Sequence, residues 1–349
     1  MADVSLASGA VLLYLQFGTG DLEQIFTSLK DMLSSGEMSL SVEMAAVMIA
    51  LAAILKSAQF PAHGWLIEVM ETPTPVSALL HAGLLNAGPF LVTRMAFVME
   101  GATAAPVVLI LFGSFTALFA SAAFLTQPSI KTALGYSSVA HMGFMLLVCA
   151  LGVYPAAMLH LVAHSFYKAH AFLSSGSVVE TARASRIPLP ARLGSPLRIG
   201  LSILISLLIY LGFAYLWGLD PAQELPLLAT GAIVVMGLTQ IIAPALDASG
   251  MKSAIFRAGG LALLVATAFF SLESGAHYLL ASQLPTLSNP GLLMLSLTAL
   301  VLLVYAVAVF LQILSPVLPQ HEQMARLAVH LRQGFYANAL FDHCRTEYG

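Results

Sequence analysis

Charged side chains are scarce in this sequence. Its 349 residues include 14 Lys and Arg and 17 Asp and Glu, which together make up 9% of the chain. Soluble globular proteins carry about 25% charged residues. With 59% hydrophobic residues and a mean hydropathy of +0.89, the composition excludes a soluble enzyme, a disordered chain and a nucleic-acid binder, which needs a basic face. It predicts a polytopic helical protein embedded in membrane lipid.

Cysteines and nucleotide-binding motifs are also lacking. The two cysteines are Cys149, inside an apolar run, and Cys344, in the polar C-terminal tail, so neither a disulfide framework nor a metal cluster is expected. The sequence has no glycine-rich dinucleotide fingerprint, phosphate-binding loop or nucleophile elbow. We therefore expect no metal and no cofactor in this chain. These absences favour a path for ions or protons over ATP-driven transport or an enzyme acting by itself.

Long apolar runs, in contrast, are abundant. A spanning helix needs about twenty mostly apolar residues, and about ten segments approach that length. The predicted spans are roughly Ser5–Phe17, Val42–Leu66, Pro75–Val98, Thr103–Leu125, Ile130–Leu151, Val153–Val178, Ile199–Trp217, Leu225–Leu246, Ala254–Leu272 and Gly291–Val317. The predicted fold class is an all-α, polytopic membrane helix bundle of about ten transmembrane helices, with discontinuous helices and a short C-terminal amphipathic helix.

Basic residues orient these spans. Four arginines crowd the linker 181–198, and Lys252 and Arg257 mark another linker two spans further on. The positive-inside rule places both linkers in the cytoplasm. Ten spans then place both termini in the cytoplasm of a multi-pass protein of the cell inner membrane.

The Arg- and Pro-rich linker also divides the chain. Residues 1–180 form a charge-bearing helix bundle, 181–198 the cytoplasmic linker, 199–318 the nearly chargeless C-terminal helices, and 319–349 a cytoplasmic amphipathic tail. We expect that tail to lie on the membrane face or to pack against a partner subunit.

Ionisable residues inside spans cost several kcal/mol unless they are paired or hydrated, so each is a functional candidate. Lys56 follows the apolar run 45–55 and precedes Pro61, which should kink or break the helix. A break frees backbone carbonyls and is a natural lining for a hydrated cavity. A desolvated lysine there can lose and regain a proton. The alternative is that Lys56 extends its ammonium group to the membrane interface.

A second candidate is the turn that contains Pro73 and Pro75. The two prolines disfavour helix at Thr72 and Thr74, and Pro75 suits the first turn of the following helix. His81 follows about two turns later. A proton-relay role and a packing role fit His81 equally well.

The next span begins with Lys131, which is either an interfacial anchor or part of a path. Ser137 and Ser138 follow at depths where hydroxyl groups can hold water. For His141, one turn further on, packing is slightly favoured over a functional role.

The clearest pattern is the repeat of His160, His164 and Lys168 every four residues. Four residues turn a helix by roughly 400°, so the three side chains form one stripe about 12 Å long. Histidine titrates near neutrality, and such a stripe can pass protons through a hydrated interior. It is a poor metal site because no carboxylate or thiol lies at a suitable spacing.

These residues lie in segments that resemble a known family. The segments are KSAQFPAHGWLIEVMETPTPVSALLHAG, SIKTALGYSSVAHMGFM and HLVAHSFYKAHAFLSSGSV, together with GFYANALF in the tail. They resemble the antiporter-like proton-translocating membrane subunits: the subunit L/5-like proteins of NADH–quinone oxidoreductase, the multisubunit Na⁺/H⁺ antiporters, and the B-type membrane subunit of the DAB inorganic-carbon transporter. The stretch AHSFYKAHAFLSSGS is most similar to the inorganic-carbon branch.

The resemblance implies a proton relay. Lys56 matches the lysine of the broken helix, His81 the histidine after the turn, and Lys131, His160, His164 and Lys168 the central and second-half relay. It also implies a function: conduction of protons that drives inorganic carbon uptake, the hydration of CO₂ to bicarbonate, with a large peripheral zinc-containing, carbonic-anhydrase-like partner. The alternatives are a pumping subunit of NADH–quinone oxidoreductase or of a Na⁺/H⁺ antiporter, and a non-conducting anchor.

Two departures from the family pattern stand out. The family pairs its broken-helix lysine with a glutamate on an upstream helix, and we expect this sequence to lack that helix and further N-terminal spans. Glu43 lies at a span edge, in the wrong place for that pairing. Respiratory relatives often carry a charged residue in a late span, whereas Ile199–Trp217 and Leu225–Leu246 contain none, with Gln240 the most polar candidate.

Overall fold

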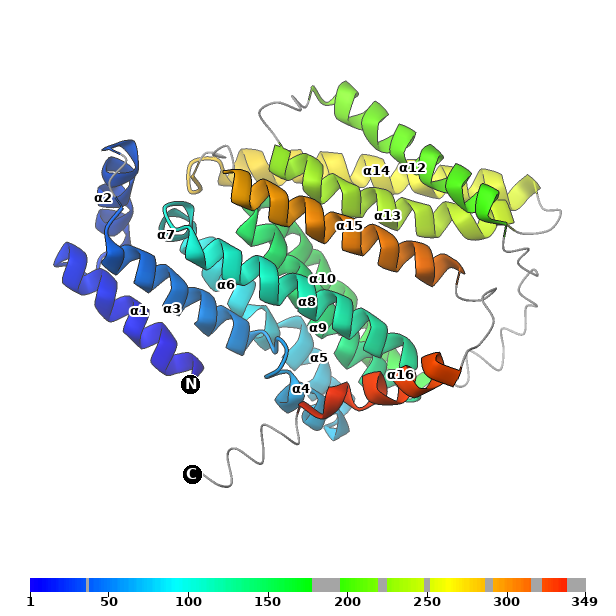
Figure 1. Cartoon of the computed structure of the whole chain (residues 1–349), viewed down its shortest axis with the longest axis horizontal. Helices are drawn as coiled ribbons and strands as arrows, with labels where there is room; N and C mark the ends of the chain where they lie inside the picture. Colours follow the sequence, from blue (N-terminus) through cyan, green and yellow to red (C-terminus); the bar gives the residue numbers. More distant parts are fainter. Residues whose placement is uncertain are drawn as a thin grey trace. The chain divides into compact units, whose positions relative to one another are not determined.

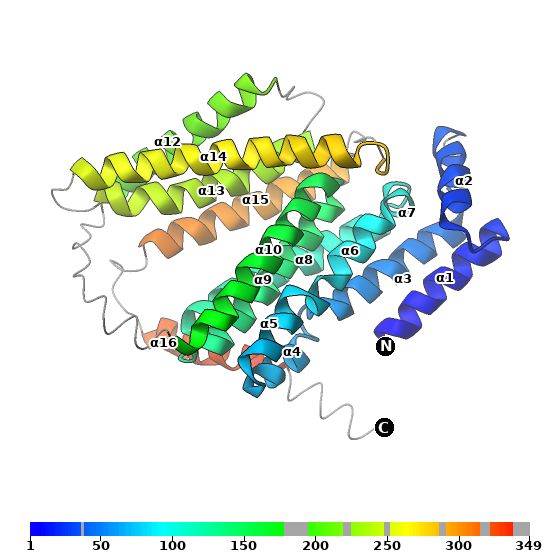
Figure 2. The same cartoon turned by 180° about the vertical axis from the view of Figure 1, so that it is seen from behind.

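The computed structural model describes residues 1–35, 38–177, 195–218, 225–247, 252–285, 291–314 and 322–337. Every regular element among these residues is a helix, which confirms the predicted all-α class (Figures 1 and 2). The longer helices are α1 (Ala2–Phe17), α2 (Leu22–Ser35), α3 (Leu40–Lys56), α8 (Ala104–Thr126), α9 (Ile130–Ala150), α10 (Tyr154–Ser174), α12 (Pro196–Leu216), α13 (Leu225–Asp247), α14 (Lys252–Leu280), α15 (Leu292–Leu314) and α16 (Glu322–Arg332). The short ones are α4 (Gly64–Glu68), η1 (Val69–Glu71), α5 (Thr74–Ala82), η2 (Leu84–Asn86), α6 (Ala87–Arg94), α7 (Ala96–Glu100), η3 (Ser175–Ser177) and η4 (Gly334–Tyr336).

Six of the described helices are long and apolar enough to cross a membrane. They are Thr74–Arg94, Ala104–Thr126, Ile130–Ala150, Pro196–Leu216, Ser253–Leu280 and Leu292–Phe310, and Ala2–Phe17 and Val234–Leu246 are shorter apolar helices. The sequence predicted about ten spans. Two of the differences have a clear cause: α3 stops after 17 residues at the helix break, and α10 contains the polar stripe, which lowers its hydropathy.

The described helices form two compact units. Unit 1 contains α1 to α10 together with α16, and unit 2 contains α12 to α15. Three of the four linker arginines, the acidic loop 219–224 and residues 338–349 of the tail lie outside the described residues.

The core of unit 1 is built by close helix crossings. Helix α8 packs along α9, α10 packs against α5 and α9, and α1 packs on α3. The α8–α9 crossing depends on Gly113 and Gly143, because a Cβ atom on either glycine would lie 2.6 Å from the carbonyl oxygen of the other. Small residues allow this approach between membrane helices.

The predicted helix break is present at the end of α3. The helix ends at Lys56, and α4 begins at Gly64. Within the connecting segment the Ser57 hydroxyl donates to the Ala53 carbonyl at 2.8 Å, and the Phe60 amide donates to Thr116 Oγ1 of α8 at 3.2 Å. The second bond satisfies a backbone amide beyond the end of the helix, whereas the Ala53 carbonyl also accepts from the Ser57 amide at 3.0 Å.

Glu43 has a structural role at the other end of α3. Its carboxylate accepts hydrogen bonds from the backbone amides of Thr103 and Ala104, at 3.1 Å and 2.6 Å. The residue at the start of α8, Thr103, forms no side-chain cap of its own. Glu43 therefore caps α8 from a neighbouring helix, where its negative charge also complements the helix dipole.

Among its described residues, unit 2 has an aromatic core and a buried acid. Tyr210 and Phe213 of α12 contact Phe270 of α14, with ring centroids 5.5 and 5.7 Å apart. Glu273, one turn after Phe270, is 8% exposed within the apolar helix Ser253–Leu280. The predicted span ended at Leu272, so this acid was not expected to lie inside the helix.

Candidate functional site

The stripe on α10 faces α9. Helices α9 and α10 follow each other through residues 151–153 and pack side by side (Figure 2). Lys168 is fully buried, and its ammonium group donates to Ser137 Oγ at 2.9 Å and to the Leu134 carbonyl at 3.1 Å. Both of these hydrogen-bond acceptors are neutral. A charged side chain inside a membrane is costly unless it is paired or hydrated.

Two turns before Lys168, a histidine pair bridges the same two helices. His141 Nδ1 of α9 lies 2.9 Å from His160 Nε2 of α10, which is a hydrogen bond in either tautomeric arrangement. The His164 ring lies along α10 between Lys168 and this histidine pair, 5.3 Å from the His141 ring. Both of its nitrogens are buried and have no hydrogen-bond partner among the described residues. The structure therefore gives His141 a polar contact in place of the mainly packing role expected from the sequence.

His81 approaches this interface from α5. It is fully buried, and its ring stacks on Phe172 of α10 at a centroid distance of 4.4 Å. Both ring nitrogens are buried and unpartnered among the described residues. Lys168 and Lys131 are its charged neighbours.

Lys131 lies in the first turn of α9 and donates from Nζ to the Thr72 carbonyl. That carbonyl belongs to the proline turn: Pro73 is the residue before α5, and Pro75 lies in the first turn of α5. The Lys131 ammonium group therefore contacts the turn that contains Pro73 and Pro75. Ser138 is buried, but its hydroxyl donates to the Leu134 carbonyl of its own helix.

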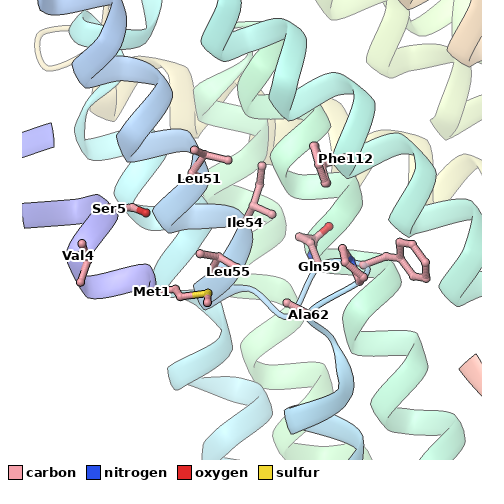
Figure 3. A pocket seen from close by; sticks show the side chains of 11 residues that line it. Met1, Val4, Ser5, Leu51, Ile54, Leu55, Gln59, Ala62 and Phe112 are labelled. Atoms are coloured by element: carbon pink, nitrogen blue, oxygen red, sulfur yellow. The ribbon is translucent and has the colours of Figure 1, made fainter. Parts of the chain in front are cut away.

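Lys56 lies in a different environment. Its side chain is 43% exposed, and Nζ lies 2.7 Å from Asp3 Oδ1 of α1. Beside it, a cavity of about 540 Å³ opens between α1, α3, α8 and the break. The cavity is mostly apolar, with Pro61, Gln59 and Ser5 in its lining (Figure 3).

Two residues that contact the predicted site residues, Asp3 and His141, were not themselves among the predictions. An acid in the first turn of an apolar helix was the signal for Asp3, but its partner is 53 positions away and no local pattern connects the two. For His141 the signal was its spacing of four and three residues from Ser137 and Ser138, which puts all three near one helix face. The pairing with His160 depends on how α9 packs against α10.

The described residues contain no group of three His, Cys, Asp or Glu side chains that could hold a metal ion. The His141, His160 and His164 rings are close, but two of them are hydrogen-bonded to each other. What this arrangement can do chemically is hold and exchange protons, because three imidazoles and an amine that donates to a hydroxyl group lie along one interface.

Fold and site together define an antiporter-like membrane subunit. A family model described as "NADH:quinone oxidoreductase/Mrp antiporter, TM" matches residues 1–216. The chain belongs to this family, which confirms the resemblance seen in the sequence.

Relatives of two kinds are similar to this chain. A probable inorganic carbon transporter subunit DabB2 from Halothiobacillus neapolitanus is 36% identical over 335 residues, which is 96% of this chain and 60% of that protein. A probable subunit DabB from Hydrogenovibrio crunogenus is 42% identical over 54% of this chain and 36% of its own length. The NAD(P)H-quinone oxidoreductase chain 5 from Synechocystis is 39% identical over 51% of this chain and 27% of its own length.

The fold also matches a solved structure, that of the Mrp complex from Dietzia. The TM-score is 0.53 at 22% sequence identity, covering 99% of this chain and 42% of the matched chain. This match supports the helical arrangement. The present chain spans about 60% or less of the length of the curated relatives named above.

Proposed function

We propose that this chain is a proton-conducting membrane subunit that couples the proton-motive force to inorganic carbon uptake. The observation that supports conduction best is the buried α9–α10 interface, where Lys168 and the His141–His160 pair lie at two levels about 12 Å apart. Few explanations other than proton exchange account for so many ionisable groups inside apolar helices.

The proposed path begins with a proton on the His141–His160 pair. A hydrogen bond between two imidazoles lets one ring pass a proton to the other when the ring nitrogens exchange donor and acceptor roles. His164 and Lys168 continue the path at intervals of one helical turn. Water would connect the nitrogens of His164 and His81, because buried polar groups without a protein partner are normally hydrated.

The carbon-uptake branch is supported by the extent of similarity. The similarity to the DabB2 subunit covers 96% of this chain, whereas that to the quinone oxidoreductase chain covers 51%. In this proposal a peripheral zinc-containing, carbonic-anhydrase-like partner hydrates CO₂, and the proton flow through this chain makes the reaction run one way. The protein would lie in the cell inner membrane with both termini in the cytoplasm.

The second candidate is a pumping subunit of an NADH–quinone oxidoreductase or a Na⁺/H⁺ antiporter. The 39% identity to chain 5 of the Synechocystis oxidoreductase favours it. A third possibility, the non-conducting anchor, predicts that the stripe residues are dispensable.

Isolation of the complex from its native membrane separates these candidates. Carbon uptake predicts copurification with a large zinc protein, and bicarbonate accumulation that stops when a protonophore is added. NADH–quinone activity or Na⁺ sensitivity that depends on this chain would contradict it and support the second candidate. Bicarbonate accumulation that is unaffected by loss of the chain's ionisable groups would leave the anchor role.

A further inference from the structure

The C-terminal segment of unit 1 reaches back to the helix break. Figure 1 shows α16 passing the ends of α8 and α9 towards α4. Two hydrogen bonds join α16 to α8: Arg332 Nε donates to the Thr126 carbonyl at 3.0 Å, and Gln127 Nε2 donates to the Arg332 carbonyl at 3.3 Å. The last turn of α16 is therefore fixed to the end of α8.

The chain then makes an unusual turn. Gly334, Phe335 and Tyr336 have φ angles of 60°, 54° and 59°, all in the left-handed region. Two of the three are bulky, and such residues adopt this conformation only where their surroundings impose it. Phe335 lies with its ring centroid 5.6 Å from that of Phe119 of α8. Packing against α8 therefore holds the turn in its unfavourable conformation.

A buried histidine of the break lies under this turn. His63, the residue before α4, is 1% exposed. A Cβ atom on Gly334 would lie 3.1 Å from His63 Nε2 and 2.9 Å from Tyr136 Oη. A side chain at position 334 would therefore crowd the His63 and Tyr136 rings. The rings of Phe60 and Phe119 enclose the histidine from other directions.

We propose that residues 332–336 form a lid over the helix break, and that His63 beneath it exchanges protons with water on that side when the lid lifts. The lid itself rests on the contacts above, whereas the proton-carrying role of His63 rests on the proposed function. Neither the α9–α10 stripe nor the Asp3–Lys56 pair uses this histidine. The lid is held by two hydrogen bonds, the contact of Phe335 with Phe119 and the close packing of Gly334 on His63 and Tyr136. These contacts are local, so opening the lid requires no unfolding of the bundle.

Cysteine labelling tests the lid without any measurement of conduction. His63→Cys is introduced into the full chain with Cys149 and Cys344 replaced by alanine, and its reaction with a small water-soluble thiol reagent is followed in native membranes. We expect Phe335→Ala to raise the labelling rate about tenfold, the factor that corresponds to loss of an aromatic contact in the closed state. Arg332→Ala should raise it in the same direction.

Two controls accompany this experiment. Val329→Ala, at an exposed position of α16, should leave the rate unchanged. Ala62→Cys, which lines the cavity beside α1 and α3, should label at one rate with or without Phe335. If His63→Cys does not accumulate, Tyr136→Cys is the second reporter under the same turn. Equal labelling of the reporter with the lid intact and with Phe335→Ala would overturn the lid.

The role of His63 is tested separately in the reconstituted complex. His63→Phe keeps an aromatic ring in the enclosure but removes proton exchange, so we expect proton uptake to fall several-fold with unchanged assembly. Normal uptake by His63→Phe would overturn the proton-carrying role of the histidine. The existence of the lid is decided by the labelling experiment alone. A failure of the proposed function would show differently, as normal uptake after removal of Lys168.

Discussion

Lys56 and Lys168 both lie in apolar helices of unit 1, and the sequence resemblance predicted both as relay residues, but their surroundings differ. Lys168 is fully buried and donates to a hydroxyl and a carbonyl. Lys56 is 43% exposed and forms an ion pair with Asp3. A buried ammonium group with neutral acceptors is costly to keep charged, whereas an ion pair keeps both partners charged.

This difference separates two tasks that the sequence pattern assigns equally to both lysines. Lys168 is buried with neutral hydrogen-bond acceptors, as the proposed relay requires. Lys56 is held by a charged partner at the exposed end of its helix. The following predictions would break or sharpen this comparison.

The largest effect is expected at Lys168. Lys168→Met should lower proton uptake by the reconstituted complex by about 100-fold or more, the range for loss of a positioned proton-transfer group. Lys168→Arg should be nearly as damaging, because arginine keeps its charge but does not give up a proton. Proton uptake is measured with a pH-sensitive dye in liposomes, with the exposed Arg257→Met as the control. Wild-type uptake by Lys168→Arg would show that only the positive charge is needed.

A smaller effect is expected at the histidine pair. His141→Gln retains a side chain that can hydrogen-bond His160, whereas His141→Phe does not. His141→Phe should reduce proton uptake about fivefold more than His141→Gln, the factor for one hydrogen bond of about 1 kcal/mol. Equal rates near the wild-type level for the two variants would argue that the pair serves packing only, as the sequence suggested for His141.

A still smaller effect, with a characteristic rescue, is expected at the exposed ion pair. Asp3→Asn and Lys56→Met should each slow proton uptake, and the exchange Asp3→Lys with Lys56→Asp should restore part of it, because the charges then attract again. Chain levels in the membrane should stay normal throughout. If proton uptake by the exchanged double variant is as slow as that of the single variants, attraction between opposite charges is not sufficient. The chemical identity of the side chain at each position then matters as well.

The smallest functional effect is expected at Glu43, which caps α8 and lies apart from the relay. Glu43→Gln should lower the free energy of unfolding by about 1 kcal/mol, the usual contribution of a helix cap. Thermal unfolding of the purified complex in detergent measures this change. Proton uptake per folded complex should stay at the wild-type level, and a specific loss of uptake would make Glu43 a relay candidate again.

The parts of the site that repeat along one helix were predictable from the sequence. His160, His164 and Lys168 share a face because the helical period puts every fourth residue there. The helix break before Pro61 was predictable for a similarly local reason, since proline removes a backbone donor. The family's segments added the assignment of Lys131 and His81, which no local rule connects to the stripe.

Contacts between helices were beyond reach of these local rules. Asp3 pairs with Lys56, His141 with His160, and Glu43 with the start of α8, each across a helix boundary that the spacing of residues does not encode. Counting spans by hydropathy also had limits. Helix α10 is too polar on average to count as a span, although its polar face is turned inward.

The sequence by itself determined that this chain is a membrane protein, where its helix breaks, and which helix bears the titratable stripe. These properties follow from hydropathy, proline geometry and helical period, all of which act within a few residues. The tertiary structure alone decided which ionisable groups meet, which of the two lysines is buried, and that a turn of the tail covers His63. Each of these depends on the packing of segments far apart in the chain, where shape and burial, more than local preference, fix the neighbours.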